Sequence, residues 1–199
     1  MNDRTATFSR ATGETDVSLT LGLDGRGAGT RRTGVGFFDH MLDLLARHGH
    51  LDLDVEATGD LETGSHHTVE DTGLVLGQAL DAALGDRRGI RRYGHAVVPM
   101  DEARAACAID LSGRPFCVLS GLELPPGDIA GYEHELTEEF FRAVANAARL
   151  TLHVELQAGT NVHHLIEAAF KAFARALRVA VSIDPEESGV PSTKGTLTS

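Results

Sequence analysis

With 199 residues, 42% of them hydrophobic, the chain can bury a real core as one domain or two small ones. Its formal net charge of −11 excludes a global electrostatic footprint for nucleic acid or an anionic membrane, so an anionic ligand would need a local basic cluster. The polar start lacks an apolar signal region and no apolar run approaches the roughly 18 residues that span a bilayer, so we expect a cytoplasmic protein.

The first third of the chain predicts a strand, a helix and a second strand. Residues 10–20 alternate small, polar and apolar side chains, which is typical of a strand, and Glu14 is expected there as a solvated carboxylate. The apolar spacing over residues 37–45 predicts a helix with His40 on its more polar side. Residues 51–55 alternate strictly, which indicates a half-buried strand.

An adjacent histidine pair then opens a helix that is expected to end near Gly85. The motif is H-H-x-x-E at 66–70, and it recurs at 163–167. Helical residues three or four apart share a face, so one histidine of each pair can converge with Glu70 or with Glu167. Neighbouring helical residues point about 100° apart, so the imidazoles of one pair cannot easily bind one ion. One copy could be a solvated helix start, but identical duplication predicts two metals.

Between the two motifs lie an arginine-rich turn and several strands. Residues 85–94 concentrate four arginines between glycines, and such a run usually forms a solvated turn. Strands are expected at residues 95–100, 103–111 and 115–119, and the turn at 110–115 leaves Arg114 at a loop tip. Cys107 and Cys117 lie in these strands and are expected to be core thiols rather than a disulfide.

The remaining chain repeats the order of the first part. A helix beginning near 137, an alternating strand at 150–156 and a glycine-containing loop lead to the second motif. We therefore expect two pseudo-repeats, residues 1–92 and 93–184, that pack as one compact unit. The fold class is α+β, with mostly antiparallel sheets and helices packed on one face.

Residues 185–199 form a predicted C-terminal substrate-binding tail. Its P-S-T-K-G segment at 191–195 offers hydroxyl groups, backbone N–H groups and one of only two lysines. Together with Arg92 and Arg114 it could form a phosphate pocket, although alone it would resemble a frayed end.

Eight side chains are candidate metal ligands: His40, His66, His67, Glu70, Glu139, His163, His164 and Glu167. Eight groups for two octahedral ions leave about two open positions on each, which favours catalysis over a closed structural site. Mixed nitrogen and oxygen ligation suits manganese, iron or zinc. The histidines that lack a paired geometry are expected to be surface or core residues: His48, His50, His95, His134 and His153.

With these residues, the chain resembles the imidazoleglycerol-phosphate dehydratases of histidine biosynthesis over nearly its whole length. The motifs that carry the resemblance are R-x-T-x-E-T at 10–15, G-F-F-D-H-M-L at 36–42, H-H-T-V-E-D at 66–71, R-Y-G at 92–94, P-M-D-E-A at 99–103, D-L-S-G-R-P at 110–115, H-H-x-x-E-A-x-F-K-A-F-A-R-A-L at 163–177 and P-S-T-K-G at 191–195.

The resemblance implies a lyase that dehydrates D-erythro-imidazole glycerol phosphate to imidazole acetol phosphate with two manganese ions. One ion would be bound by His40, His67, Glu70 and His164, and the other by His66, His163, Glu167 and Glu139. Substrate contacts would come from Glu14, His40, His48, Arg92, Arg114, Ser192, Thr193 and Lys194. The groups implied in catalysis are Glu167, Glu14, His66 and His163.

The resemblance also implies a fold and an assembly. The fold would be two βαββα-type half-domains like domain 2 of ribosomal protein S5, and the assembly a 24-subunit homo-oligomer with active sites between subunits. Metals on both ring nitrogens would stabilise an imidazolate that expels the hydroxyl group, while Glu167 or Glu14 moves protons.

Two positions depart from the family pattern, and other functions fit the same groups. Some members carry histidine where this chain has Glu139, and an aspartate often stands at Gly64, where its loss could loosen support for His66 or His67. A binuclear metallohydrolase acting on a small phosphate ester would use similar ligands but would release inorganic phosphate. A metal-storage cage would take up ions without turnover.

Overall fold

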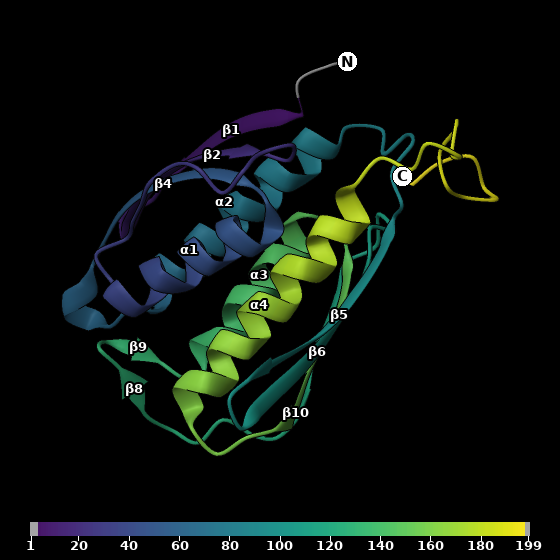
Figure 1. Cartoon of the computed structure of the whole chain (residues 1–199). Helices are drawn as coiled ribbons and strands as arrows, with labels where there is room; N and C mark the ends of the chain where they lie inside the picture. Colours follow the sequence, from purple (N-terminus) through teal and green to yellow (C-terminus); the bar gives the residue numbers. More distant parts are fainter. Residues whose placement is uncertain (1–3, 198–199) are drawn as a thin grey trace.

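The computed structural model describes residues 4–197; residues 1–3 of the first predicted repeat and 198–199 of the tail lie outside them. Two four-stranded sheets form the outer layers (Figure 1). The first sheet has the order β1-β2-β4-β3 and contains β1 (Thr5–Ala11), β2 (Thr15–Gly22), β4 (Asp52–Gly59) and β3 (Arg31–Arg32). The second has the order β5-β6-β10-β7 and contains β5 (Tyr93–Met100), β6 (Ala103–Asp110), β10 (Thr151–Ala158) and β7 (Phe116–Gly121).

Four helices lie between the sheets (Figure 1). They are α1 (Gly36–Gly49), α2 (His66–Leu84), α3 (Leu136–Ala147) and α4 (Val162–Val181). Helix α2 packs on β1, β2 and α3, whereas α4 packs on β5, β6 and α1. A 3₁₀ turn, η1 (Leu61–Thr63), precedes α2, and a small hairpin, β8 (Asp128–Ile129) and β9 (Tyr132–Glu133), precedes α3. Each helix pair, α2 with α3 and α1 with α4, therefore joins one helix from each half of the chain.

Alternating burial along the strands explains the layers. Val17, Leu19 and Leu21 of β2 are buried while the residues between them are not, so one face of the sheet packs against the helices. The predicted alternation over 51–55 is confirmed as part of β4. Helices α2 and α3 approach closely because Gly77 has no side chain: a Cβ there would lie 2.7 Å from the Val144 carbonyl oxygen.

The α+β class, the mostly antiparallel sheets and the duplicated pattern are confirmed. Apart from the small β8–β9 hairpin of the second half, the order within each half is β-β-β-α-β-α, one strand more than the predicted βαββα arrangement. The extra strand of the first half, β3, is only two residues long and pairs in parallel with β4, so no alternation in the sequence reveals it. The two cysteines are free, as expected.

The predicted single strand over residues 10–20 is wrong. The chain turns between β1 and β2 at residues 12–14, because the Thr12 hydroxyl accepts hydrogen bonds from the backbone N–H groups of Glu14 (3.1 Å) and Thr15 (3.0 Å). Glu14 therefore lies at a hairpin turn and not within a strand.

The arginine-rich segment is only partly the solvated turn that the sequence favours, because Arg87 is 0% exposed. Its guanidinium donates to Asp81 on α2 (2.5 Å) and to the carbonyl oxygens of Leu111 (2.9 Å) and Ala148 (2.9 Å) in the second half. Arg149 also pairs with Asp81 (2.8 Å). This buried charge is neutralised and hydrogen-bonded, so it ties the end of α2 to the second half of the chain.

Replacing Arg87 should therefore destabilise the fold. Arg87→Met leaves Asp81 with one cation fewer and two buried carbonyl groups without a donor, so we expect a loss of about 3 kcal/mol and a melting temperature roughly 6–12 °C lower. Arg88→Met, at the exposed neighbouring position, is the matched control and should change stability by less than about 0.5 kcal/mol. Thermal unfolding followed by circular dichroism measures both, and equal melting temperatures for the two variants would contradict this role.

Candidate active site

The second histidine pair lies at the start of α4, where Asn161 caps the helix. The Asn161 side-chain oxygen accepts hydrogen bonds from the backbone N–H groups of His163 (3.0 Å) and His164 (3.4 Å). The cap fixes the first turn of the helix, so the two adjacent imidazoles diverge: their rings are nearly perpendicular, at 84°.

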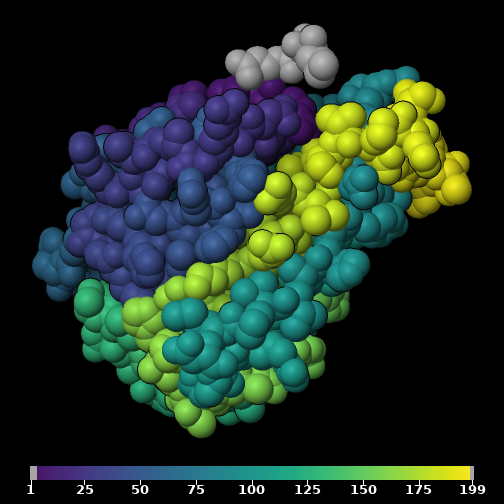
Figure 2. Space-filling view, in the orientation of Figure 1, coloured from purple at the N-terminus to yellow at the C-terminus, as the bar shows by residue number. Residues whose placement is uncertain are grey.

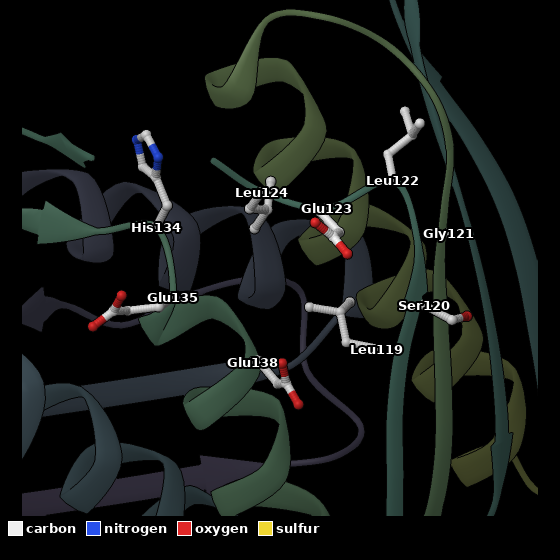
Figure 3. Close-up of a pocket in the computed structure, with 9 residues that line it drawn as sticks. All are labelled: Leu119, Ser120, Gly121, Leu122, Glu123, Leu124, His134, Glu135 and Glu138. Carbon is white, nitrogen blue, oxygen red and sulfur yellow. The ribbon is translucent and has the colours of Figure 1, made fainter. Parts of the chain in front are cut away.

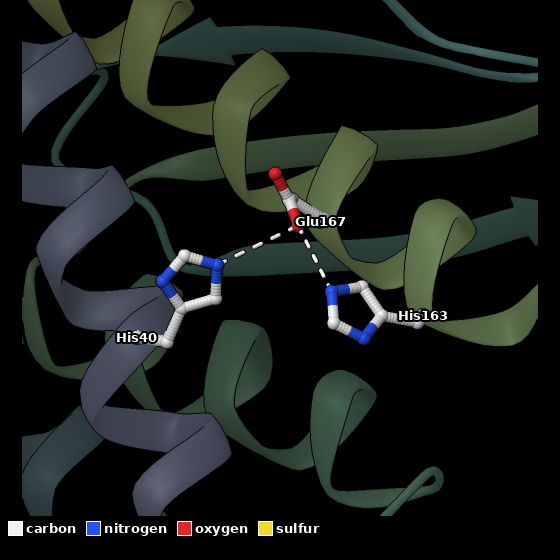
Figure 4. A group of neighbouring side chains, drawn as sticks. All are labelled: His40, His163 and Glu167. Carbon is white, nitrogen blue, oxygen red and sulfur yellow. Dashed lines mark hydrogen bonds and ion pairs between the residues drawn. The ribbon is translucent and has the colours of Figure 1, made fainter.

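His163 and Glu167 converge with His40 (Figure 4). The Nε2 atoms of His163 and His40 lie 3.1 Å and 3.6 Å from the same oxygen of Glu167, Oε2. His40 comes from α1, which packs on α4, so helix packing brings it to a carboxylate that is 127 residues away in the sequence. Among residues 4–197, this is the one group of three or more such side chains whose ligand atoms all lie within 4.8 Å of one another.

Glu167 is buried and shares its two oxygens between different partners. Its Oε1 atom pairs with the Lys171 ammonium at 2.6 Å, one turn further along α4, while Oε2 faces the imidazoles. Burial alone raises the pKa of Glu167, but Lys171 and the neighbouring imidazoles outweigh it and hold the pKa below its usual value. The carboxylate is therefore ionised and available as a ligand.

A carboxylate braces the second histidine of each pair. The Nδ1 atom of His67 lies 3.0 Å from Asp60 in the loop before α2, and the Nδ1 atom of His164 lies 2.8 Å from Glu102 in the turn between β5 and β6. When Nδ1 carries the proton, Nε2 has a free lone pair that points away from the brace, which is how metal-binding histidines are usually held.

These contacts change the pKa values of both partners. The hydrogen bond from His164 lowers the pKa of Glu102 to about 2, with further donation from the backbone N–H groups of Asn161 and Thr160. The same hydrogen bond raises the pKa of His164, and the hydrogen bond with Asp60 raises that of His67.

The first histidine pair forms a looser group at the start of α2. The His66 Nε2 atom lies 3.7 Å from Glu70, and the His67 Nε2 atom lies 3.8 Å from Glu14 at the β1–β2 turn. Glu139 lies on α3, which packs on α2, and its Oε1 atom pairs with Arg142 at 2.8 Å.

The predicted ligands thus divide between two helix pairs. We call His40, His163, His164 and Glu167 the α1/α4 half-site. We call His66, His67, Glu70 and Glu139 the α2/α3 half-site. Each predicted ligand set takes two residues from each half-site. Among the described residues of one chain, the ligand atoms of neither set all lie within 4.8 Å of one another.

The predicted phosphate-binding residues line one pocket. Arg92, Arg114, Ser192, Thr193 and Lys194 surround it. Asp110 orients the two arginines, with contacts of 2.7 Å to Arg92 and 3.9 Å to Arg114, and Arg92 donates to the Pro191 carbonyl at 2.8 Å. Arg92 thereby anchors the tail, which lies beside the start of the second sheet (Figure 2).

This predicted phosphate pocket lies at the far end of α4 from the α1/α4 half-site. The Arg92 backbone N–H donates to the Ala180 carbonyl at 3.0 Å, whereas His163 stands in the first turn of α4. At a rise of about 1.5 Å per residue, roughly 25 Å separate these positions along the helix. A small phosphorylated ligand cannot reach both within one chain.

The other positions named from the sequence lie elsewhere. His48 lines a groove with Lys171 and Arg175. Its pKa is lowered mainly by burial, and further by the positive charges of Lys171 and Arg175. His134 lines the pocket of Figure 3 beside Glu135 and Glu138, but its Nδ1 atom is 2.8 Å from the Pro125 carbonyl oxygen, which is a structural contact. That pocket holds none of the predicted site residues.

Gly64, one of the two departures from the family pattern, has φ 116°, a value that favours glycine. An aspartate at that position would be strained, and its added Cβ would lie 3.1 Å from Glu133. The loop instead supplies Asp60 to His67.

Sequence reasoning missed three supporting residues: Asp60, Glu102 and Lys171. Glu102 belongs to the P-M-D-E-A motif and Lys171 follows Glu167 by four residues, so both carried a signal. Asp60 lies in an irregular loop, and only the folded chain shows that it reaches His67.

The fold and this site define an α+β protein in which a carboxylate holds the second histidine of each of two pairs, with a separate pocket lined by two arginines and a lysine. The sequence model of imidazoleglycerol-phosphate dehydratases matches residues 33–177. Relatives with that description include those of Jannaschia sp. (strain CCS1), 56% identical over 98% of this chain and 100% of the relative, and Moorella thermoacetica, 57% identical over 98% of each.

Solved structures agree. The imidazoleglycerol-phosphate dehydratase of Staphylococcus aureus covers 90% of this chain with 99% of its own, at a TM-score of 0.81 and 40% identity. The enzyme of Pyrococcus furiosus in complex with (S)-C348 covers 95% of this chain with 99% of its own, at a TM-score of 0.82 and 34% identity. The chain belongs to the imidazoleglycerol-phosphate dehydratase family. The predicted family and enzyme class, a dehydratase of histidine biosynthesis, are confirmed.

The brace on His164 can be tested in the metal-free protein. Glu102→Gln removes the negative acceptor, so the pKa of His164 should fall towards its ordinary value of 6.5, and Asp60→Asn should do the same for His67. The pair of His164 with Glu102 stabilises the fold fully between the ordinary pKa values of glutamate, 4.5, and histidine, 6.5. That stability is lost as pH rises through the raised pKa of folded His164, and as pH falls towards the lowered pKa of folded Glu102, about 2.

NMR titration of labelled histidine rings measures these shifts. His67 in Glu102→Gln and His164 in Asp60→Asn are the internal controls, and each should keep its raised pKa because its own carboxylate partner is unchanged. An unchanged His164 titration in Glu102→Gln would show that the brace does not hold this imidazole.

Proposed function

We propose that the chain dehydrates D-erythro-imidazole glycerol phosphate to imidazole acetol phosphate at a site that binds two manganese ions and the substrate phosphate. The observation that carries the proposal is the convergence of two imidazole nitrogens on one ionised carboxylate oxygen of Glu167. This donor set of nitrogen and oxygen, without sulfur, fits manganese.

The proposed ligand sets are those that the family resemblance implies. One ion would be held by His40, His67, Glu70 and His164, and the other by His66, Glu139, His163 and Glu167. The braces on His67 and His164 favour Nε2 as the ligand atom of both. When bound, the two cations would act as Lewis acids that stabilise negative charge on the substrate ring.

The two candidate proton carriers, Glu167 and Glu14, differ in how they are held. Both oxygens of Glu167 are engaged, with Lys171 on one side and imidazoles on the other, so Glu167 suits a ligand. The side chain of Glu14 is 58% exposed, and its near neighbour is the His67 Nε2 atom at 3.8 Å. Glu14 therefore keeps a free oxygen beside the metal ligands and is the better acceptor for the substrate proton.

A complete active site would be shared between subunits. The two half-sites stay apart within one chain, and the phosphate pocket lies about 25 Å along α4 from His163. Joining the α1/α4 half-site of one subunit to the α2/α3 half-site of another would assemble both ligand sets, and a further chain would bring the phosphate pocket to them. The 24-subunit homo-oligomer implied by the resemblance would provide such contacts.

Exposed apolar side chains support self-association. Tyr93, Val97 and Phe116 of the second sheet are 57%, 59% and 58% exposed, and Ile183 after α4 is 51% exposed. Large apolar side chains that are this exposed favour burial against another chain.

We place the enzyme in the cytoplasm. Within residues 4–197, no helix is long and apolar enough to cross a membrane.

Metal dependence and the role of Glu167 can be tested together. The purified protein should form ketone from imidazole glycerol phosphate with manganese, lose turnover on chelation and regain it when manganese is restored. Glu167→Gln removes the charge on which two imidazoles converge, so kcat should fall by roughly 100-fold or more while circular dichroism stays native.

Phosphate release in the same assay separates the proposal from the metallohydrolase alternative. A dehydratase leaves the ester intact, so inorganic phosphate should stay at background while ketone accumulates. Full turnover after exhaustive chelation, or native kcat in Glu167→Gln, would exclude the proposed metal site.

A further inference from the structure

In each half of the chain, a β-hairpin turn brings a carboxylate to the second histidine of the H-H-x-x-E motif. In the first half Glu14, at the turn between β1 and β2, lies 3.8 Å from His67. In the second half Glu102, at the turn between β5 and β6, lies 2.8 Å from His164. The two turns occupy equivalent places in the duplicated fold.

The two turn carboxylates have diverged in role. Glu102 contacts the Nδ1 atom of His164 and also accepts hydrogen bonds from the backbone N–H groups of Thr160 (3.2 Å) and Asn161 (2.8 Å). It therefore fixes its own turn against the start of α4. In the first half, Asp60 contacts the Nδ1 atom of His67, so Glu14 lies on the Nε2 side, where ligands bind.

This arrangement leaves the Glu14 carboxylate without the backbone contacts that fix the Glu102 carboxylate, although the Glu14 carbonyl accepts from the Asp60 backbone N–H at 3.1 Å. The first turn therefore needs another side-chain anchor. Asp71 on α2 supplies one, and it is 8% exposed. Its Oδ1 atom accepts from Arg10 Nε at 2.8 Å, and its Oδ2 atom accepts from the Thr15 hydroxyl. Arg10 is near the end of β1 and Thr15 begins β2, so one carboxylate holds both sides of the turn.

The motifs differ at the position of this anchor. Asp71 closes H-H-T-V-E-D, whereas the same position of H-H-L-I-E-A is Ala168. The Asp71 carboxylate is thus found in the half whose turn glutamate does not use its side chain to hold the turn against the helix. Both Asp71 oxygens are occupied by Arg10 and Thr15, so Asp71 is directed at the hairpin and not at the histidines.

We propose that Asp71 is a positioning residue that holds the β1–β2 turn against α2 and thereby places the Glu14 carboxylate beside His67 for proton transfer. The inference rests on the proposed role of Glu14. Arg10 and Thr15 carry the effect from Asp71 to the turn, and Asp71 itself touches neither substrate nor metal. A misplacement of about 1 Å in a reacting group can lower a rate by roughly 100-fold, so such an anchor matters for turnover.

A double-mutant cycle between Asp71 and Glu14 tests the inference in the manganese-loaded enzyme. Glu14→Gln should lower kcat by roughly 100-fold or more, and Asp71→Asn, which keeps the side-chain shape, by at least about tenfold. Once Glu14 cannot take the proton its position no longer matters, so the double variant should be within about twofold of Glu14→Gln alone. Manganese content and the circular dichroism spectrum should stay native in Asp71→Asn.

Two threonines of β2 provide a matched control. Thr15→Val removes a donor to Asp71 and should lower kcat as Asp71→Asn does, whereas Thr15→Ser keeps the hydroxyl and should restore it. Thr20→Val removes a hydroxyl that bonds Thr7 (2.9 Å) across the same two strands, away from the turn, and should leave kcat native.

The outcomes separate this inference from the proposed function. Native kcat in Glu14→Gln would overturn the role of Glu14 and the inference with it. A slow Glu14→Gln variant together with native kcat in Asp71→Asn, or losses that multiply in the double variant, would overturn only the role of Asp71. Equal losses in Thr15→Val and Thr20→Val would show a general effect on the hairpin and would also overturn it.

Discussion

Adjacent residues on a helix point about 100° apart, and this angle governs how each histidine pair is used. In α4 the first imidazole turns towards Glu167, four residues on, while the second turns outwards to Glu102. In α2 the same divergence sends His66 towards Glu70 and His67 towards Asp60. In the proposed site, two imidazoles that cannot bind one ion would bind two, and each ion would need ligands from both helix pairs.

Helix packing decides where the remaining proposed ligands come from. The pairing of α1 with α4 brings His40 to Glu167, and the pairing of α2 with α3 places Glu139 on the helix beside Glu70. Duplication thus builds two incomplete half-sites from one plan. The unequal use of the hairpin turns, with Glu102 fixed by its own contacts and Glu14 held through Asp71, shows how copies of one unit acquire different tasks.

Much of this was accessible from the sequence because it depends on local periodicity. The helices that carry His40, His66 and His163 each begin within one residue of the position that the sequence pattern predicts. The hairpin turn at Glu14 was missed because a single Thr12 hydroxyl creates it within a continuous alternation. The burial of Arg87 was missed because its partners, Leu111 and Ala148, come from distant segments.

Half-sites from different subunits would complete one active site, and mixed assemblies test this sharing most directly. Glu167→Gln damages the α1/α4 half-site and Glu70→Gln the α2/α3 half-site, so each variant alone should be nearly inactive. Equal amounts dissociated and reassembled together should regain roughly a quarter of native activity, because some sites then combine two intact halves. Mixed shells, verified by native mass spectrometry, that remain as inactive as either parent would contradict the account.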